Sequence, residues 1–168
     1  MPLKPALCTP GSARLSVAVL WGPQWRVDQK EPPLREAAAL RGIERYFKGL
    51  DCLDRLAIHR VILPDPQAPL SDAQLLAMAE GDAVDRVILI MVRELGPKLL
   101  IGIPTLVEGG TEVVLEARVI DRASASALAQ VRTHWQKGGP FYIKGVKTLD
   151  QDMQTALGHV FSATDARE

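Results

Sequence analysis

Val84-Asp85-Arg86-Val87-Ile88-Leu89-Ile90-Met91-Val92 is apolar except at its second and third residues. A run this apolar predicts a strand that is covered on both faces, as a central parallel strand is. Upstream, Leu15-Ser16-Val17-Ala18-Val19-Leu20 and the segment from Leu56 to Leu63 have the composition of two further buried strands. The three segments predict the parallel part of an α/β sheet.

Two helices are predicted between these strands. The segment 34–49 brings Ile43 and Phe47 to one face at helical spacing, whereas charged residues such as Arg35 are expected on its solvated face. The second helix begins at Ser71-Asp72-Ala73-Gln74, a capping box, and ends near residue 80. Right-handed crossovers through these helices make the three strands parallel.

The pattern changes after Arg93. Turn signals at Gly96-Pro97, at Glu108-Gly109-Gly110-Thr111 and at Asp121-Arg122-Ala123-Ser124 bound three more predicted strands, which span 98–107, 111–121 and 127–137. Apolar and polar residues alternate in the last two, as they do in an antiparallel meander with one wet face. A loop over 138–145 then precedes a final helix, whose apolar stripe consists of Leu149, Met153, Ala156, Leu157 and Val160.

These elements predict a mixed α/β sheet in the order β-α-β-α-β, followed by an antiparallel β-meander and a C-terminal helix, with the helices packed on the sheet. The chain has 168 residues, which is the usual size of one domain. We therefore expect a flexible N-terminal segment over 1–13, a single α/β domain over 14–161 and a frayed tail over 162–168.

The composition excludes several classes of protein. Hydrophobic residues make up 47% and charged residues 24% of the chain, which is typical of a globular protein and excludes a disordered one. Twenty basic residues balance twenty acidic ones, so the basic surplus usual in nucleic-acid-binding proteins is absent. No apolar run reaches the ~18 residues that a membrane-spanning helix needs.

Two stretches resemble those of a known family. Gly81-Asp82-Ala83-Val84-Asp85-Arg86-Val87-Ile88-Leu89 is similar to a G-A-D-x-V-L segment, and Glu112-Val113-Val114-Leu115-Glu116-Ala117-Arg118-Val119-Ile120-Asp121 to a V-x-A-R-L-I-D strand. Together they resemble the superfamily of bacterial envelope proteins that contains the amino-terminal domain of TolB, the curli-secretion protein CsgG and LpoB. The resemblance implies a non-catalytic α/β module, often lipid-anchored in the periplasm, that docks on other envelope proteins.

No arrangement of residues predicts catalysis. The histidines lack metal-ligand spacing, and the chain contains neither a C-x-x-C pair nor a G-x-S-x-G elbow. Glu112 and Glu116 are expected to share the wet face of one strand and to pair with neighbours such as Arg132. We therefore predict no catalytic residue, no metal site and no cofactor.

Aromatic side chains in loops are the stronger signal, because such residues are enriched at protein interfaces. In open α/β sheets, binding sites lie beyond the carboxyl ends of parallel strands, where the segments following all three predicted strands meet. The predicted partner-binding residues are Trp21, Gln24, Trp25, Asp65, Phe141 and Tyr142. The alternative is that these aromatic residues fold back onto the core.

The loop before the last helix also suggests an anion site. Gly139, Lys144, Lys147 and Thr148 precede a capped helix N-terminus, which could hold a phosphate group. The loop is not a Walker A motif, because Lys144 precedes its second glycine. The alternative is a flexible connection with a proline turn.

Cys8 and Cys52 each precede a predicted strand. If those strands are parallel neighbours, the two cysteines lie at the same end of the sheet and a disulfide is sterically allowed. Such a bond persists only in an oxidising compartment. The alternatives are two ordinary thiols, or a lipid anchor on Cys8, because the residues before it resemble the end of a lipoprotein leader.

Three functional hypotheses follow. The leading one is a non-enzymatic bacterial envelope module, periplasmic or associated with the outer membrane, which binds another envelope protein and meets the membrane only through a lipid anchor. The second is a cytoplasmic α/β protein that binds a small phosphorylated ligand or nucleotide at the strand-end crevice. The third is a homo-oligomer subunit, since the zero net charge opposes self-association weakly.

Overall fold

The computed structural model describes residues 14–25, 32–63, 69–102, 106–140 and 149–161. The strands are β1 (Leu15–Pro23), β2 (Leu53–Arg60), β3 (Arg86–Gly102), β4 (Leu106–Asp121) and β5 (Ser126–Pro140). The helices are α1 (Pro32–Lys48), α2 (Asp72–Met78) and α3 (Leu149–Phe161), with a short 3-10 turn η1 (Glu80–Asp82) after α2. The predicted segments 1–13 and 162–168 lie outside the described residues.

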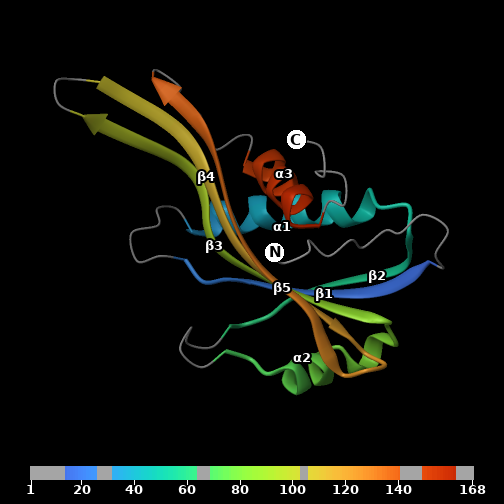
Figure 1. The fold of residues 1–168 in the computed structure, drawn as a ribbon. Coiled ribbons are helices and arrows are strands. Elements are labelled where there is room, and N and C mark those ends of the chain that lie inside the picture. The colour runs from blue at the N-terminus through green and yellow to red at the C-terminus, as the bar shows by residue number, and fades with distance from the viewer. Residues whose placement is uncertain (1–13, 26–31, 64–68, 103–105, 141–148, 162–168) are drawn as a thin grey trace.

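The strands form one five-stranded sheet in the order β2-β1-β3-β4-β5. β1 pairs in parallel with β2 and with β3, whereas β3, β4 and β5 are joined in antiparallel order. α1 and α3 cover one face of this sheet and α2 the other, as Figure 1 shows. The predicted fold class, a mixed α/β sheet with an antiparallel meander and a C-terminal helix, is confirmed.

Each face of the sheet has its own apolar core, because successive side chains of a strand point to opposite faces. Val19 and Ile88 belong to the larger core under α1 and α3, whereas Leu20 and Leu89 belong to the smaller one under α2. The predicted stripe of α3 is completely buried in the larger core, as expected from its spacing. α2 has 7 residues, against 17 in α1 and 13 in α3, so it covers less of its face.

For α1, helical spacing predicted the buried apolar residues correctly but the exposure of one charged residue wrongly. Ile43 and Phe47 are buried in the larger core, as expected. Arg35, expected on the solvated face, is also buried, and its guanidinium donates a hydrogen bond to the carbonyl oxygen of Leu95. Periodicity does not predict this contact, because it depends on where β3 passes under the helix.

The predicted turns at Gly96-Pro97 and at 108–111 are wrong, because β3 and β4 run through them. Parallel pairing with β1 ends at Val92, so beyond that residue β3 pairs with β4 alone. A proline lacks the N–H that a second neighbour would need, and it is therefore tolerated on such an outer edge. The outer ends of β3, β4 and β5 consequently form a three-stranded arm that projects past the helices (Figure 1).

The capping box that begins α2 is confirmed. Ser71 accepts a hydrogen bond from the Gln74 backbone N–H at 3.2 Å, and the Gln74 side chain accepts one from the Ser71 N–H at 2.8 Å. This box fixes the direction in which the chain enters α2 after β2. None of the helices in the described ranges is long and apolar enough to cross a bilayer.

Candidate functional site

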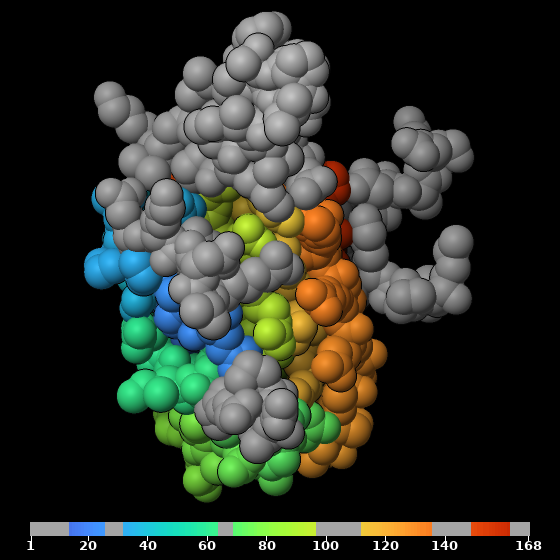
Figure 2. All heavy atoms as spheres, turned by 90° about the vertical axis from the view of Figure 1, so that its left-hand side faces the viewer, coloured from blue at the N-terminus to red at the C-terminus, as the bar shows by residue number. Residues whose placement is uncertain are grey.

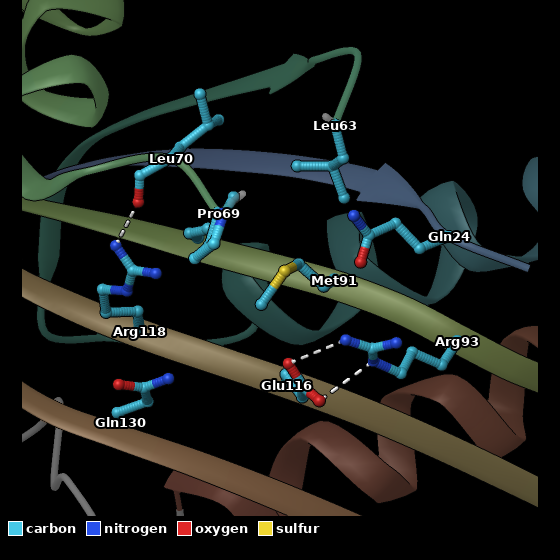
Figure 3. Close-up of a pocket in the computed structure, with 10 residues that line it drawn as sticks. Gln24, Leu63, Pro69, Leu70, Met91, Arg93, Glu116, Arg118 and Gln130 are labelled. Atoms are coloured by element: carbon cyan, nitrogen blue, oxygen red, sulfur yellow. Dashed lines mark hydrogen bonds and ion pairs between the residues drawn. The ribbon is translucent and has the colours of Figure 1, made fainter. Parts of the chain in front are cut away.

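A cleft lies on the α2 side of the sheet, where α2 leaves the strands uncovered (Figure 3). Gln24 reaches it from the end of β1, Leu63 from the segment after β2, and Arg93 from β3 just beyond its parallel part. The segments that follow the three parallel strands therefore meet at one place, as the sheet topology predicts. Pro69 and Leu70, which lead into α2, close one side.

The floor of the cleft is apolar. Leu89 and Met91 of β3 form it and belong to the smaller core, so they are held rigidly between β1 and β4. The rim is polar and comes from β4 and β5, with Glu116, Arg118 and Gln130. An apolar floor with a polar rim suits a ligand that is itself apolar at its tip.

The rim carboxylate of Glu116 is paired with arginine side chains of β3 and β5. The Arg93 Nε atom lies 2.9 Å from the Glu116 Oε1 atom, and the Arg132 Nε atom is 4.0 Å from the same oxygen. The expected partner of Glu116, Arg132, is thus only the more distant of two. Glu112, expected on the same wet face, is instead buried and pairs with His134. Since Arg93 is already neutralised by an adjacent carboxylate, it offers a bound anion little net charge.

Arg118 ties the two walls of the cleft together. Its guanidinium donates to the Leu70 carbonyl oxygen at 2.7 Å and to Asp72 Oδ1 at 3.2 Å. The residue is only 8% exposed, and hydrogen bonds from a charged donor are worth about 1.5–3 kcal/mol. Arg118 therefore fixes the entry of α2 against β4 and holds the cleft open at a set width.

The size of the cleft limits what it can hold. Its volume is about 170 Å³, whereas pockets for cofactors and drug-sized ligands occupy roughly 300–1,000 Å³. A cavity of about 150 Å³ is known to accept a single benzene ring. The cleft therefore matches one large side chain better than a nucleotide.

The predicted partner-binding residues have different positions in the structure. Gln24 lines the cleft. Trp21 does not lie in a loop: it belongs to β1 and is 1% exposed, so its ring is part of the larger core and its predicted surface role is wrong. Trp25 is partly buried against the same core. Asp65, Phe141 and Tyr142 lie outside the described residues.

The predicted anion-binding set is placed only in part. Gly139 lies in β5, opposite Gly109 of β4, rather than in a loop. The predicted loop position of Gly139 is therefore wrong. β5 extends to Pro140, just as β3 and β4 extend through the two predicted turns. Lys144, Lys147 and Thr148 lie outside the described residues.

The condition for the predicted disulfide is met, since β1 and β2 are parallel neighbours. The Leu15 N–H donates to the Cys52 carbonyl oxygen at 2.9 Å, so Cys52 lies beside the start of β1. Cys52 carries no free thiol. Cys8 lies outside the described residues, and its pairing with Cys52 stays a prediction.

Two shifted pKa values belong to structural groups away from the cleft. Burial of Tyr46 on α1 raises its pKa to about 12. At the end of β4, hydrogen bonds from Ser124 and the nearby Arg86 hold the pKa of Asp121 below its usual value. Within the described ranges, no group of histidine, cysteine and carboxylate side chains has the arrangement of a metal site.

Sequence reasoning missed most of the lining residues. Met91 and Leu89 look like ordinary core residues, and Arg118 looks like a charge on a wet face. The available signals were the convergence of the parallel strand ends, which gave Gln24, and the position of Arg93 directly after the apolar run 84–92. The rest of the cleft depends on which strand of the meander pairs with β3.

No family model matches this chain. No curated protein matches it either. Similar solved structures include the PelC dodecamer from Paraburkholderia phytofirmans, which is 17% identical with a TM-score of 0.49 over 95% of this chain and 94% of that one. The hypothetical protein CT253 from Chlamydia trachomatis is 11% identical with a TM-score of 0.49, over 89% and 92%. Lipoprotein GNA1162 from Neisseria meningitidis is 12% identical with a TM-score of 0.45, over 86% and 97%. These three bacterial proteins, one of them a lipoprotein, are similar to this chain in general fold.

Proposed function

We propose that this chain is a non-enzymatic module of the bacterial envelope, and that it binds another protein through the cleft. The observation that carries the proposal is the small apolar floor between Gln24, Arg93 and Arg118, whose volume of about 170 Å³ fits one anchoring side chain. Interfaces concentrate their binding energy in a few such anchors, surrounded by polar groups that exclude water. The placement in the envelope rests on the sequence resemblance of the segments 81–89 and 112–121.

The alternative, a nucleotide or phosphorylated ligand in the same crevice, is less well supported. The two arginines of the cleft are engaged by Glu116, by Asp72 and by a backbone carbonyl. A phosphate group would have to compete with these partners for the two arginines. The nucleoside attached to it would also be larger than the cleft. This alternative predicts a rise in melting temperature with nucleotides or phosphometabolites, whereas the proposed function predicts none.

Photocrosslinking in the native cells tests the docking role. A photoreactive residue at the exposed rim position Gln130 is expected to give a discrete adduct with one envelope protein. The same residue at Gln151, exposed on α3 on the opposite face of the sheet, is the control and should give none. Gln24→Trp, which fills the cleft, should abolish the Gln130 adduct, whereas Gln151→Trp should preserve it. Equal adducts at both positions, or an adduct insensitive to Gln24→Trp, would contradict the proposal.

The envelope placement has a separate test. The intact mass of the protein from its native cells, alkylated without reduction, distinguishes the compartments. A Cys8–Cys52 disulfide or a lipid on Cys8 supports export. Two alkylated cysteines would place the chain in a reducing compartment and refute an envelope location.

A further inference from the structure

The apolar floor of the cleft contains a sulfur atom. Met91 forms this floor together with Leu89, and in Figure 3 its thioether lies amid the other lining residues. Met91 is 8% exposed, so most of its side chain is held by the smaller core and only a small part can touch a ligand. Thioethers make favourable contacts with aromatic rings, with the sulfur about 5 Å from the ring. The floor is therefore better suited to a ring than a purely aliphatic floor would be.

Two guanidinium groups also line the cleft. Arg118 donates to the Leu70 carbonyl oxygen and to Asp72, and Arg93 donates to Glu116. The N–H bonds of a guanidinium lie in its plane, so these partners occupy the edges of the two groups and leave their faces unused. The face of a guanidinium stacks on an aromatic ring, because the ring presents its negative face to the cation.

The charges of the cleft favour a neutral ligand. The two arginines, Arg93 and Arg118, are balanced by the carboxylates of Glu116 and Asp72. A charged anchor would enter this site without a partner of its own, and burial of an unpaired charge is unfavourable. The amide of Gln130, exposed at the rim, can both donate to and accept from the backbone of a bound segment.

The strand that forms the floor reaches the surface of the molecule. In Figure 2, the yellow-green atoms of β3 come to the surface between the blue atoms of β1 and the orange atoms of β5. A segment of another protein can approach β3 from this side. The cleft volume of about 170 Å³ is close to that of a cavity of about 150 Å³ that takes up one benzene ring. The volume therefore matches a single six-membered ring.

We propose that the anchor bound by the cleft is the ring of a phenylalanine or tyrosine side chain in a segment of the partner protein. Met91 and the faces of Arg93 and Arg118 select this ring over an aliphatic side chain of the same size. The inference rests on the proposed function, because it names the part of the partner that the cleft binds. A different measurement decides it, made on the purified full chain with small probe molecules.

NMR of methionine methyl groups tests the choice of anchor. The probes are N-acetyl-phenylalaninamide and N-acetyl-cyclohexylalaninamide, which differ in the saturation of the ring. The phenylalanine probe is expected to bind about fivefold more tightly or better, and its ring current should move the Met91 methyl resonance upfield. Met78, exposed on α2, and Met153, buried against α1, are internal controls whose resonances should stay in place.

Two pairs of proteins show whether the selectivity belongs to the cleft. Met91→Leu keeps an apolar floor of similar volume and removes the sulfur, so ligand-observed NMR should show a smaller preference for the phenylalanine probe than in the wild type. Gln24→Trp, which fills the cleft, should abolish binding of both probes. Gln151→Trp, on the opposite face of the sheet, should leave the affinities unchanged.

The outcomes for the anchor and for the docking role are distinguishable. Equal affinity for the two probes, tighter binding of the saturated probe, or no binding of either overturns the aromatic anchor. If the photocrosslinked adduct at Gln130 persists in that case, the proposed function stands and the anchor is of another kind. A chain that prefers the phenylalanine probe but gives no adduct refutes the docking role and supports the selectivity of the cleft for a ring.

Discussion

Gly42 of α1 lies against Met153 of α3 so closely that a Cβ atom at position 42 would stand 2.5 Å from the Met153 Cβ atom and 2.7 Å from the Asp150 carbonyl oxygen. Real Cβ atoms essentially never approach so near. The absence of a side chain at this position is therefore what lets the two helices pack side by side over the sheet.

Gly42→Ala is expected to destabilise the protein by about 1–3 kcal/mol, because the extra methyl group forces α1 and α3 apart. Urea unfolding measures the change. Gly158→Ala is the matched control, because Gly158 lies in α3 with open space around it. This substitution should stabilise the protein by roughly 0.5–1 kcal/mol through the higher helix propensity of alanine. Similar effects at both positions would show that the helices do not pack as described.

Trp21→Ala should destabilise the protein by about 3–5 kcal/mol, as expected for a large side chain removed from a core. The indole Nε1 of Trp21 is buried without a hydrogen-bond partner in the described part of the chain. Trp21→Phe removes this orphan donor and keeps a ring, so it should cost clearly less. If Trp21→Ala left the unfolding midpoint unchanged, the residue would be a surface anchor after all.

Arg118→Met should cost about 1–3 kcal/mol, because the Leu70 carbonyl and Asp72 lose their buried partner. Amide hydrogen exchange is expected to accelerate in α2, whose entry the guanidinium fixes. Arg132→Met is the control: its side chain is 63% exposed and 4.0 Å from Glu116, so it should change stability by less than about 0.5 kcal/mol. Unchanged amide exchange in α2 would contradict the conclusion that Arg118 fixes the start of this helix against β4.

Stability is expected to fall as the pH rises from 10 toward about 12, because burial raises the pKa of Tyr46 from 10.0 to about 12. The unfolded chain releases the phenolic proton near pH 10, whereas the folded chain keeps it, so alkali favours unfolding over this interval. Tyr46→Phe should remove this part of the pH dependence. Unfolding by guanidinium chloride at a series of alkaline pH values measures this dependence. If stability fell equally with pH in the wild type and in Tyr46→Phe, the fall would not come from Tyr46.

Local pattern was sufficient for the type and order of most elements. The apolar run 84–92 predicted a central strand, and the stripe that begins at Leu149 predicted a buried helix face, because burial of an amphipathic face follows directly from spacing. The capping box at Ser71 was equally local and was confirmed. The place of the crevice followed from topology, since the ends of adjacent parallel strands must converge.

The extent of the meander, by contrast, was not a local property. Gly96 and Pro97 have the composition of a turn, yet they lie within β3, since only β4 flanks that strand beyond Val92. Gly96 has a φ of +146°, and a Cβ there would collide with the guanidinium of Arg35. A glycine that signals a turn in the sequence is thus required by the close approach of Arg35 of α1, whose guanidinium binds the carbonyl oxygen of the neighbouring Leu95.

The sequence by itself determined the fold class, because periodicity and capping act over a few residues and are readable from neighbours along the chain. Only the tertiary structure decided that Trp21 is core and that Arg118 is a brace across the cleft. It alone also decided that β2 is an outer strand of the described sheet. These properties depend on which segments meet in space, and the free energy of burial belongs to those contacts and not to any one segment.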